Sequence, residues 1–162
     1  MTEITRSGCT WETLDTLVRE MRPEDRTEMR LICATPGVPP ELEFRKRAAG
    51  SILQAWHVDD KLACVAGIVT LSGVGPRPLL APWLLGTPVL ERHAVSLTRG
   101  TKKWLAELQR LFGADLAGLV WIGNALHVRW LKRAEFIIHD PAPTGFAVFE
   151  RPYREYPPCV DQ

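Results

Sequence analysis

The sequence predicts an α/β domain: a mixed, mostly antiparallel twisted sheet with helices on both faces and a central parallel strand pair. Three observations lead to this fold class. Apolar segments of strand length alternate with segments whose apolar residues recur at helical spacing. A long helical pattern over residues 88–112 separates two apolar strands, as in a right-handed parallel crossover. The other neighbouring strands are joined more directly, which favours antiparallel pairing.

Helices are expected in the N-terminal third, after a weak strand pattern at residues 3–9. Between residues 14 and 21, apolar residues follow the spacing i, i+3, i+4, i+7 of one helix face. Pro23 ends that helix and opens a second one, with acidic residues in its first turn. The loop TPGVPP ends the second helix, and the charged segment 41–49 predicts a third.

Two apolar segments, residues 52–58 and 62–71, predict a β-hairpin. We interpret residues 59–61 between them as its turn. A loop rich in Gly and Pro follows, and residues 79–85 form a third core strand that contains Pro82. Because proline donates no hydrogen bond to a neighbouring strand, we expect an edge, a bulge or a splayed strand there.

The C-terminal half begins with the end of the long helix, where Gly113 is the expected C-cap. Asn124 is the expected N-cap of the next helix, because its side-chain oxygen can accept a hydrogen bond from the first turn. The elements expected after Gly113 are a strand at 116–122, a helix from Asn124 to about Arg133, and strands at 136–139 and 145–150.

Length and charge limit the classes of function. The 162 residues suit one domain, expected at residues 1–150, followed by an extended tail at 151–162. A formal net charge of +1 gives little attraction for nucleic-acid phosphates. With no signal-peptide pattern, and an apolar stretch at 62–71 of about half a membrane span, we expect a soluble protein that is not secreted. Four reduced thiols are expected: Cys9, Cys33, Cys64 and Cys159.

The order of elements resembles the GNAT fold of acyl-CoA N-acyltransferases. In that family a strand delivers an Asn at the start of a helix, which leads to a Gly-Phe pair opening the next strand. Asn124 falls on that Asn and Phe136 on that Phe, within a match over residues 121–136. PWLLGT, residues 82–87, resembles the strand that carries the acyl-CoA thioester. Together with the basic helix containing Trp104 and the segment RWLKRAEF, these segments resemble GNAT-like proteins of tailed phages.

The resemblance implies acetyl-CoA as acyl donor and an amine of a small molecule or a protein as acceptor. Splayed strands would offer backbone N–H groups to the thioester carbonyl; otherwise the same residues form an ordinary buried strand. Residues 99–102 either bind phosphates at a helix start or form the solvated face of an amphipathic helix. Asn124 is either a helix cap or a contact to the pantetheine arm. The candidate donor-binding residues are Leu84, Leu85, Gly86, Arg99, Gly100, Thr101, Lys102 and Asn124.

Three positions depart from the family pattern. The family's phosphate loop, a basic residue or Gln followed by Gly-x-Gly or Gly-x-Ala, is missing after Thr87. Leu131 occupies the position of a tyrosine that protonates the leaving thiolate, and Glu135 replaces the Gly before Phe136. These departures keep a second function open: a non-catalytic phage virion or interaction protein with a degenerate cofactor site. It would contact other phage or host proteins, in the host cytoplasm or the virion.

Four titratable residues are candidates for the base that takes the amine proton. His57 lies on the first hairpin strand, and Glu91 and His93 follow the thioester-like strand. His127 lies one turn into the helix that Asn124 caps. No spacing singles one out. The histidines do not follow the spacing of metal ligands, and no metal is expected.

Overall fold

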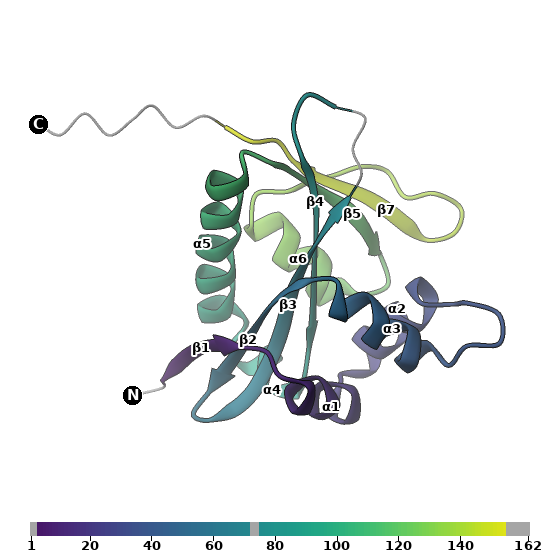
Figure 1. The fold of residues 1–162 in the computed structure, drawn as a ribbon, viewed down its shortest axis with the longest axis vertical. Coiled ribbons are helices and arrows are strands. Elements are labelled where there is room, and N and C mark those ends of the chain that lie inside the picture. The colour runs from purple at the N-terminus through teal and green to yellow at the C-terminus, as the bar shows by residue number, and fades with distance from the viewer. Residues whose placement is uncertain (1–2, 72–74, 155–162) are drawn as a thin grey trace, which may run out of the picture.

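The order of helices and strands in the structure matches the order that the sequence predicts (Figure 1). The structure is a computed structural model, and it describes residues 3–71 and 75–154. The predicted helical segment 88–112 is divided into a short and a long helix, which meet at His93. The elements are β1 (Ile4–Gly8), α1 (Trp11–Glu20), α2 (Pro23–Ile32), α3 (Pro40–Ala49), β2 (Ile52–Val58), β3 (Lys61–Leu71), β4 (Leu79–Gly86), α4 (Pro88–Arg92), α5 (Ala94–Phe112), β5 (Asp115–Trp121), α6 (Ala125–Arg133), β6 (Ile137–Ile138) and β7 (Phe146–Arg151).

One sheet of seven strands organises the described residues, in the order β1-β2-β3-β4-β5-β7-β6. Its central neighbours β4 and β5 are parallel, and the other described pairs are antiparallel. α4 and α5 connect the parallel strands, as a crossover requires. Helices α1 to α3 cover one face of the sheet, and α5 and α6 cover the other (Figure 1). The predicted fold class is confirmed.

The turn between β2 and β3 has left-handed backbone at both central residues. Asp59 has φ 46° and Asp60 has φ 61°. Two left-handed residues give a tight turn whose twist matches that of the flanking strands. The Asp59 carboxylate also accepts a hydrogen bond from the Glu3 N–H at 2.9 Å, which ties the turn to the start of β1. The predicted hairpin is therefore confirmed, although neither turn residue is glycine.

The side chains of β4 alternate between two apolar cores, because successive residues of a strand point to opposite faces. Leu80 and Leu84 belong to the core that β4 and β5 share with α5 and α6. Leu85 belongs to the core beneath α1 to α3. β4 therefore brings the two layers of the domain together at its carboxyl end.

Two helix ends match their predicted caps. Gly113 ends α5 in the left-handed conformation, with φ 57°. The Asn124 side chain accepts a hydrogen bond from the His127 N–H at 3.3 Å, so it caps α6. Glu135, which follows α6, has φ 66°, the conformation that the family's glycine would adopt without strain.

Several predictions fall partly outside the described residues. Cys9, Cys33 and Cys64 are free thiols, whereas Cys159 lies outside the described residues. The tail is described only to Arg154, so its extended form beyond that point stays a prediction. None of the described helices has the length and apolar character needed to cross a membrane.

Candidate functional site

β4 and β5 separate after a short parallel contact, which leaves a slot between their carboxyl ends. Their paired residues are Leu79 with Asp115 and Leu80 with Leu116. Pro82 is the next residue of β4 on the side that faces β5, so its missing N–H removes no hydrogen bond between strands. The splayed strand expected at Pro82 is therefore confirmed.

The backbone of β4 turns alternate N–H groups toward the slot. The Thr87 N–H donates to the Ala63 carbonyl of β3 at 2.9 Å. Because backbone N–H groups alternate in direction along a strand, the Leu85 N–H also faces β3. The N–H groups of Leu84 and Gly86 then face the slot. The Gly86 N–H donates to Asp25 Oδ2 at 2.7 Å. The Leu84 N–H therefore faces the slot, beyond Leu80, the last residue of β4 that is paired with β5. The expectation that Leu85 and Gly86 also offer donors is wrong.

Two carboxylates on one face of α2 connect the separated strand ends. Asp25 binds the Gly86 N–H at the end of β4. Glu28, one turn later on α2, accepts the Trp121 N–H at the end of β5, at 2.9 Å. Both acidic side chains are almost fully buried. α2 thus supplies acceptors for backbone donors that lost their strand partners where the slot opens.

Asn124 lies at the centre of this buried network and uses its whole amide. Its nitrogen donates to Asp25 at 2.6 Å and to Glu28 at 2.7 Å. Its oxygen accepts from Arg22 Nη2 at 3.1 Å and from the His127 N–H. A primary amide has two donors and two acceptor positions, so no capacity remains for a ligand. Of the two roles expected for Asn124, the structure supports the cap and not the pantetheine contact.

Two cationic groups balance the buried carboxylates. The buried Arg22 guanidinium binds Asp25 through Nε at 3.1 Å and Nη2 at 2.9 Å, and it reaches Glu91 at 3.3 Å. His127 Nδ1 lies 2.9 Å from Glu28 Oε2. Burial lowers the pKa of His127, but the adjacent Glu28 carboxylate outweighs burial, so the pKa is raised overall. Conversely, burial raises the pKa of Glu28, but His127 and the hydrogen bonds lower it overall, so both shifts favour the ionic form of the pair.

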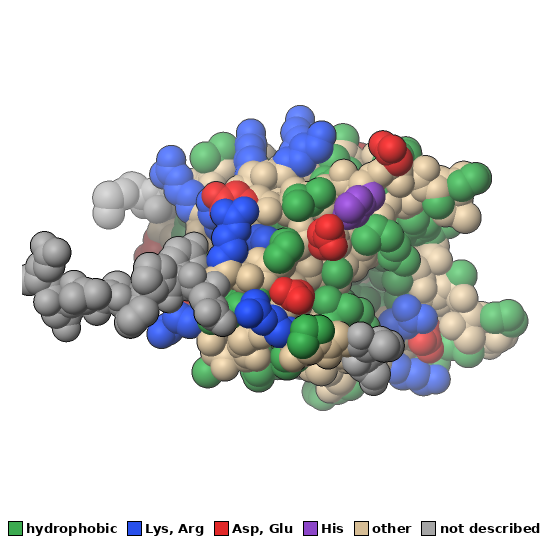
Figure 2. Space-filling model, turned by 90° about the horizontal axis from the view of Figure 1, so that it is seen from above, with side chains coloured by type: hydrophobic (Ala, Val, Ile, Leu, Met, Phe, Trp, Pro, Cys, Tyr) green, Lys and Arg blue, Asp and Glu red, His purple; other side chains and the backbone are tan. Residues whose placement is uncertain are grey.

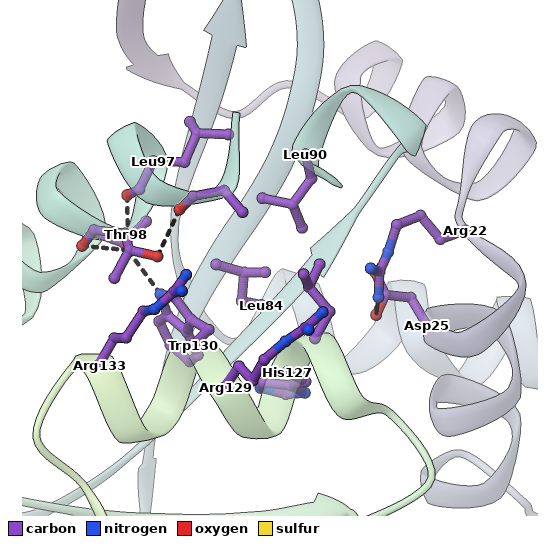
Figure 3. A pocket seen from close by; sticks show the side chains of 13 residues that line it. Arg22, Asp25, Leu84, Leu90, Leu97, Thr98, His127, Arg129, Trp130 and Arg133 are labelled. Carbon is purple, nitrogen blue, oxygen red and sulfur yellow. Dashed lines mark hydrogen bonds and ion pairs between the residues drawn. The ribbon is translucent and has the colours of Figure 1, made fainter. Parts of the chain in front are cut away.

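A pocket of about 410 Å³, including its opening to solvent, lies between α5 and α6 beside β4 (Figure 3). Leu84, Leu90 and Leu97 give it an apolar wall. Arg129 and Arg133 extend from α6 toward the side that these leucines occupy (Figure 3). The start of α5 borders the pocket and has no side-chain cap, so its first N–H groups and the two arginines suit an anion. The pocket is lined by Arg22, Asp25, Leu84, Leu90, Ala94, Leu97, Thr98, Thr101, Leu126, His127, Arg129, Trp130 and Arg133.

The four residues expected to bind phosphate at a helix start lie inside α5, where backbone N–H groups are bonded within the helix. Gly100 packs against Trp56, and a Cβ added to it would lie 2.6 Å from that ring. The Lys102 ammonium pairs with Glu135 at 2.6 Å. Thr101 borders the pocket, but its hydroxyl is bonded to the Leu97 carbonyl at 3.0 Å. Arg99 to Lys102 therefore do not lie at a helix start as expected, and phosphate binding by their side chains stays a prediction.

The four catalytic candidates separate into two groups. Glu91 and His127 belong to the network around Arg22 at the slot. His57 lies on β2, which β3 separates from β4, and it is paired with Thr5. His93 caps the start of α5 through its backbone and does not line the pocket. His57 and His93 are therefore not brought to the slot with the other two.

Three important residues were not among the sequence candidates: Arg22, Asp25 and Glu28. Asp25, Glu28 and Met29 follow the spacing i, i+3, i+4, which puts two carboxylates on the same face as a buried methionine. Acidic residues at core positions of a helix are uncommon and are paired when they occur. That spacing was the available signal for a buried charge network.

A second pocket, about 920 Å³ including its opening to solvent, lies between α5 and the end of β7. Lys and Arg side chains gather toward this side of the molecule when it is viewed from above (Figure 2). Its lining ends at Arg154, the last described residue, so the pocket is not assigned a ligand. Its charged lining residues are Lys102, Arg110, Glu135, Arg151 and Arg154.

No protein-family model and no curated protein matches this sequence. Solved structures do resemble its fold. YncA of Salmonella typhimurium, whose structure contains acetyl-CoA, has a TM-score of 0.65 at 12% identity, over 94% of this chain and 95% of that one. The GNAT domain of S. lividans PAT has a TM-score of 0.64 at 14% identity, over 90% and 88%. A ribosomal-protein-alanine N-acetyltransferase of Escherichia coli has a TM-score of 0.60 at 13% identity, over 99% and 100%.

These similarities extend over nearly the whole of each chain. At such low identity they establish architecture rather than activity. The chain therefore has the fold of the GNAT acetyltransferases.

Proposed function

We propose that this protein transfers an acyl group from an acyl-CoA, with acetyl-CoA as the donor, to an amine of a small molecule or a protein. The observation that carries the proposal is the slot between β4 and β5, which the Leu84 N–H faces, beside a pocket that two arginines border. The acetyl-CoA in the YncA structure and the N-acetyltransferase activity in the name of the Escherichia coli protein support the same chemistry.

The pocket residues suit the parts of such a donor. The Leu84 N–H would donate to the thioester carbonyl, where negative charge develops as the amine attacks. The apolar wall would hold the arm of the donor, and Arg129, Arg133 and the start of α5 would bind its phosphates. Burial lowers the pKa of His127, but the Glu28 carboxylate raises it overall and favours the charged ring, so we assign the amine proton to Glu91, the other candidate in the network at the slot.

Ligand-dependent stability tests this assignment without knowledge of the acceptor. Acetyl-CoA at 100 times its dissociation constant stabilises the folded state by about 2.7 kcal/mol, which raises the melting temperature. We expect Arg129→Ala and Arg133→Ala to weaken this shift. The matched control is Arg99→Ala, since Arg99 is an exposed arginine of α5 that does not line the pocket. Loss of the shift in the control alone would instead favour a phosphate site inside α5.

A second candidate is a binding protein with the GNAT fold and no acyl transfer. The observation that favours it is at Gly86: its N–H binds Asp25, and its carbonyl accepts the Arg22 N–H at 2.9 Å. Part of the slot edge is therefore already occupied by the chain itself. The absence of any melting shift with millimolar acetyl-CoA or CoA would reject the transferase and favour this candidate. A location in a virion or in the host cytoplasm stays a prediction from the sequence.

A further inference from the structure

One nitrogen of the pocket histidine has no hydrogen-bond partner in the described chain. His127 has only 6% of its surface exposed and lines the pocket. Its Nδ1 is bound to Glu28, whereas its Nε2 is buried without a donor or acceptor. Because burying a polar group without a hydrogen bond is destabilising, such atoms are uncommon in folded proteins unless a ligand or water meets them. Nε2 is therefore an unpartnered ring nitrogen of a residue that lines the proposed donor pocket.

The charged groups around His127 favour its doubly protonated form, in which Nε2 carries a proton. On α2, the Glu28 carboxylate contacts Nδ1 and Asp25 lies nearby, while Arg22 precedes the helix and opposes them. On its own helix, Arg129 and Arg133 line the pocket; the pocket residues of β4, α4 and α5 are uncharged. The carboxylate at contact distance outweighs the more distant cations and the burial, so the pKa of His127 is raised.

We propose that His127 is the proton donor to the sulfur of CoA and that Glu28 is its positioning residue. This inference rests on the proposed acyl transfer. When the amine nitrogen bonds to the thioester carbon, the carbon–sulfur bond breaks and its electron pair stays on sulfur. The Nε2 proton then passes to that sulfur, giving the thiol of CoA and a neutral imidazole. The amine nitrogen loses its proton to the base. Exchange with solvent then returns a proton to Nε2. The net reaction converts acyl-CoA and amine into amide and CoA.

The structural basis for this assignment is that Glu28 fixes the ring from the side away from the free nitrogen. A carboxylate on Nδ1 sets the orientation of an imidazole and stabilises its charged form, so the proton available for transfer is on Nε2. Glu28 itself is fixed by the Trp121 N–H and by Asn124. The donor is thus held by groups that also close the carboxyl ends of β4 and β5.

Affinities for CoA and desulfo-CoA, which lacks the sulfur, isolate the role of His127 without an acceptor. An imidazolium beside the sulfur favours bound thiolate, so we expect wild-type protein to bind CoA roughly tenfold to a hundredfold tighter than desulfo-CoA. His127→Gln should bind the two ligands equally while keeping its affinity for desulfo-CoA. Titration calorimetry gives both constants, and far-UV circular dichroism checks that the variant is folded.

The pH dependence of that preference separates positioning from packing. We expect the preference for CoA to disappear as pH rises through the pKa of His127, and Glu28→Gln to move this loss to lower pH with the fold intact. ¹⁵N chemical shifts of the imidazole in ligand-free protein report the same titration directly. If wild type binds both ligands equally, the assignment to His127 is overturned and acyl-CoA binding stands. If it binds neither, the proposed function fails and this inference fails with it.

Discussion

Asn124→Ala is expected to destabilise the protein by far more than the loss of a helix cap. An N-cap contributes about 1 kcal/mol, and a hydrogen bond to a charged group contributes about 1.5–3 kcal/mol. Asn124 makes such bonds to Asp25, Glu28 and Arg22 in addition to its cap. Because each carboxylate keeps other donors after the substitution, the contributions do not add fully. We expect a loss of about 3–5 kcal/mol, or roughly 10 °C in melting temperature.

Urea unfolding followed by circular dichroism measures this loss, with the slope checked for a two-state transition. Thr10→Ala is the matched control, because Thr10 caps α1 at an exposed position through Thr13 and touches no buried charge. It should cost about 1 kcal/mol. If Asn124→Ala lowers the free energy of unfolding no more than Thr10→Ala does, the view that the Asn124 amide holds the two strand ends to α2 is refuted.

Three further changes test other parts of the structure. Gly100→Ala places a Cβ 2.6 Å from the Trp56 ring, so urea unfolding should show a loss of about 1–3 kcal/mol. Glu135→Gly removes the strain of a left-handed non-glycine residue, which should raise the free energy of unfolding by about 1 kcal/mol. It also removes the weak, exposed ion pair with Lys102, so the net stability should be unchanged or slightly higher. Wild-type stability should fall at low pH as Glu28, whose pKa is lowered, becomes protonated. It should also fall at high pH as His127, whose pKa is raised, loses its proton. Urea titrations of His127→Gln should lack the fall at high pH.

The sequence was sufficient for most of the fold because its local patterns agree with one another. Pro82 in an apolar segment indicated a strand without a partner on one side, and β4 separates from β5 at that residue. Asn124 before an amphipathic segment indicated a cap, and the side chain performs that role. In both cases the deciding chemistry, a missing N–H or a short polar side chain, belongs to the residue itself.

The site was harder to predict because its residues meet across long stretches of chain. Asp25 and Glu28 are separated from Asn124 by 99 and 96 positions, and no local pattern encodes those contacts. Gly100 beside basic residues suggested a phosphate site, but it is small because Trp56 packs against it. Leu85 was grouped with Leu84, although strand alternation turns its N–H toward β3.

The buried charges of the site follow from the slot. Where β4 and β5 separate, the N–H groups of Gly86 and Trp121 need acceptors, and the carboxylates of α2 provide them. Buried carboxylates in turn need positive partners, since an unpaired buried charge is strongly destabilising. Arg22 satisfies one and His127 the other. An apolar α2 would leave both backbone donors unpaired, so the geometry that opens the proposed donor site also brings the imidazole paired with Glu28 to its wall.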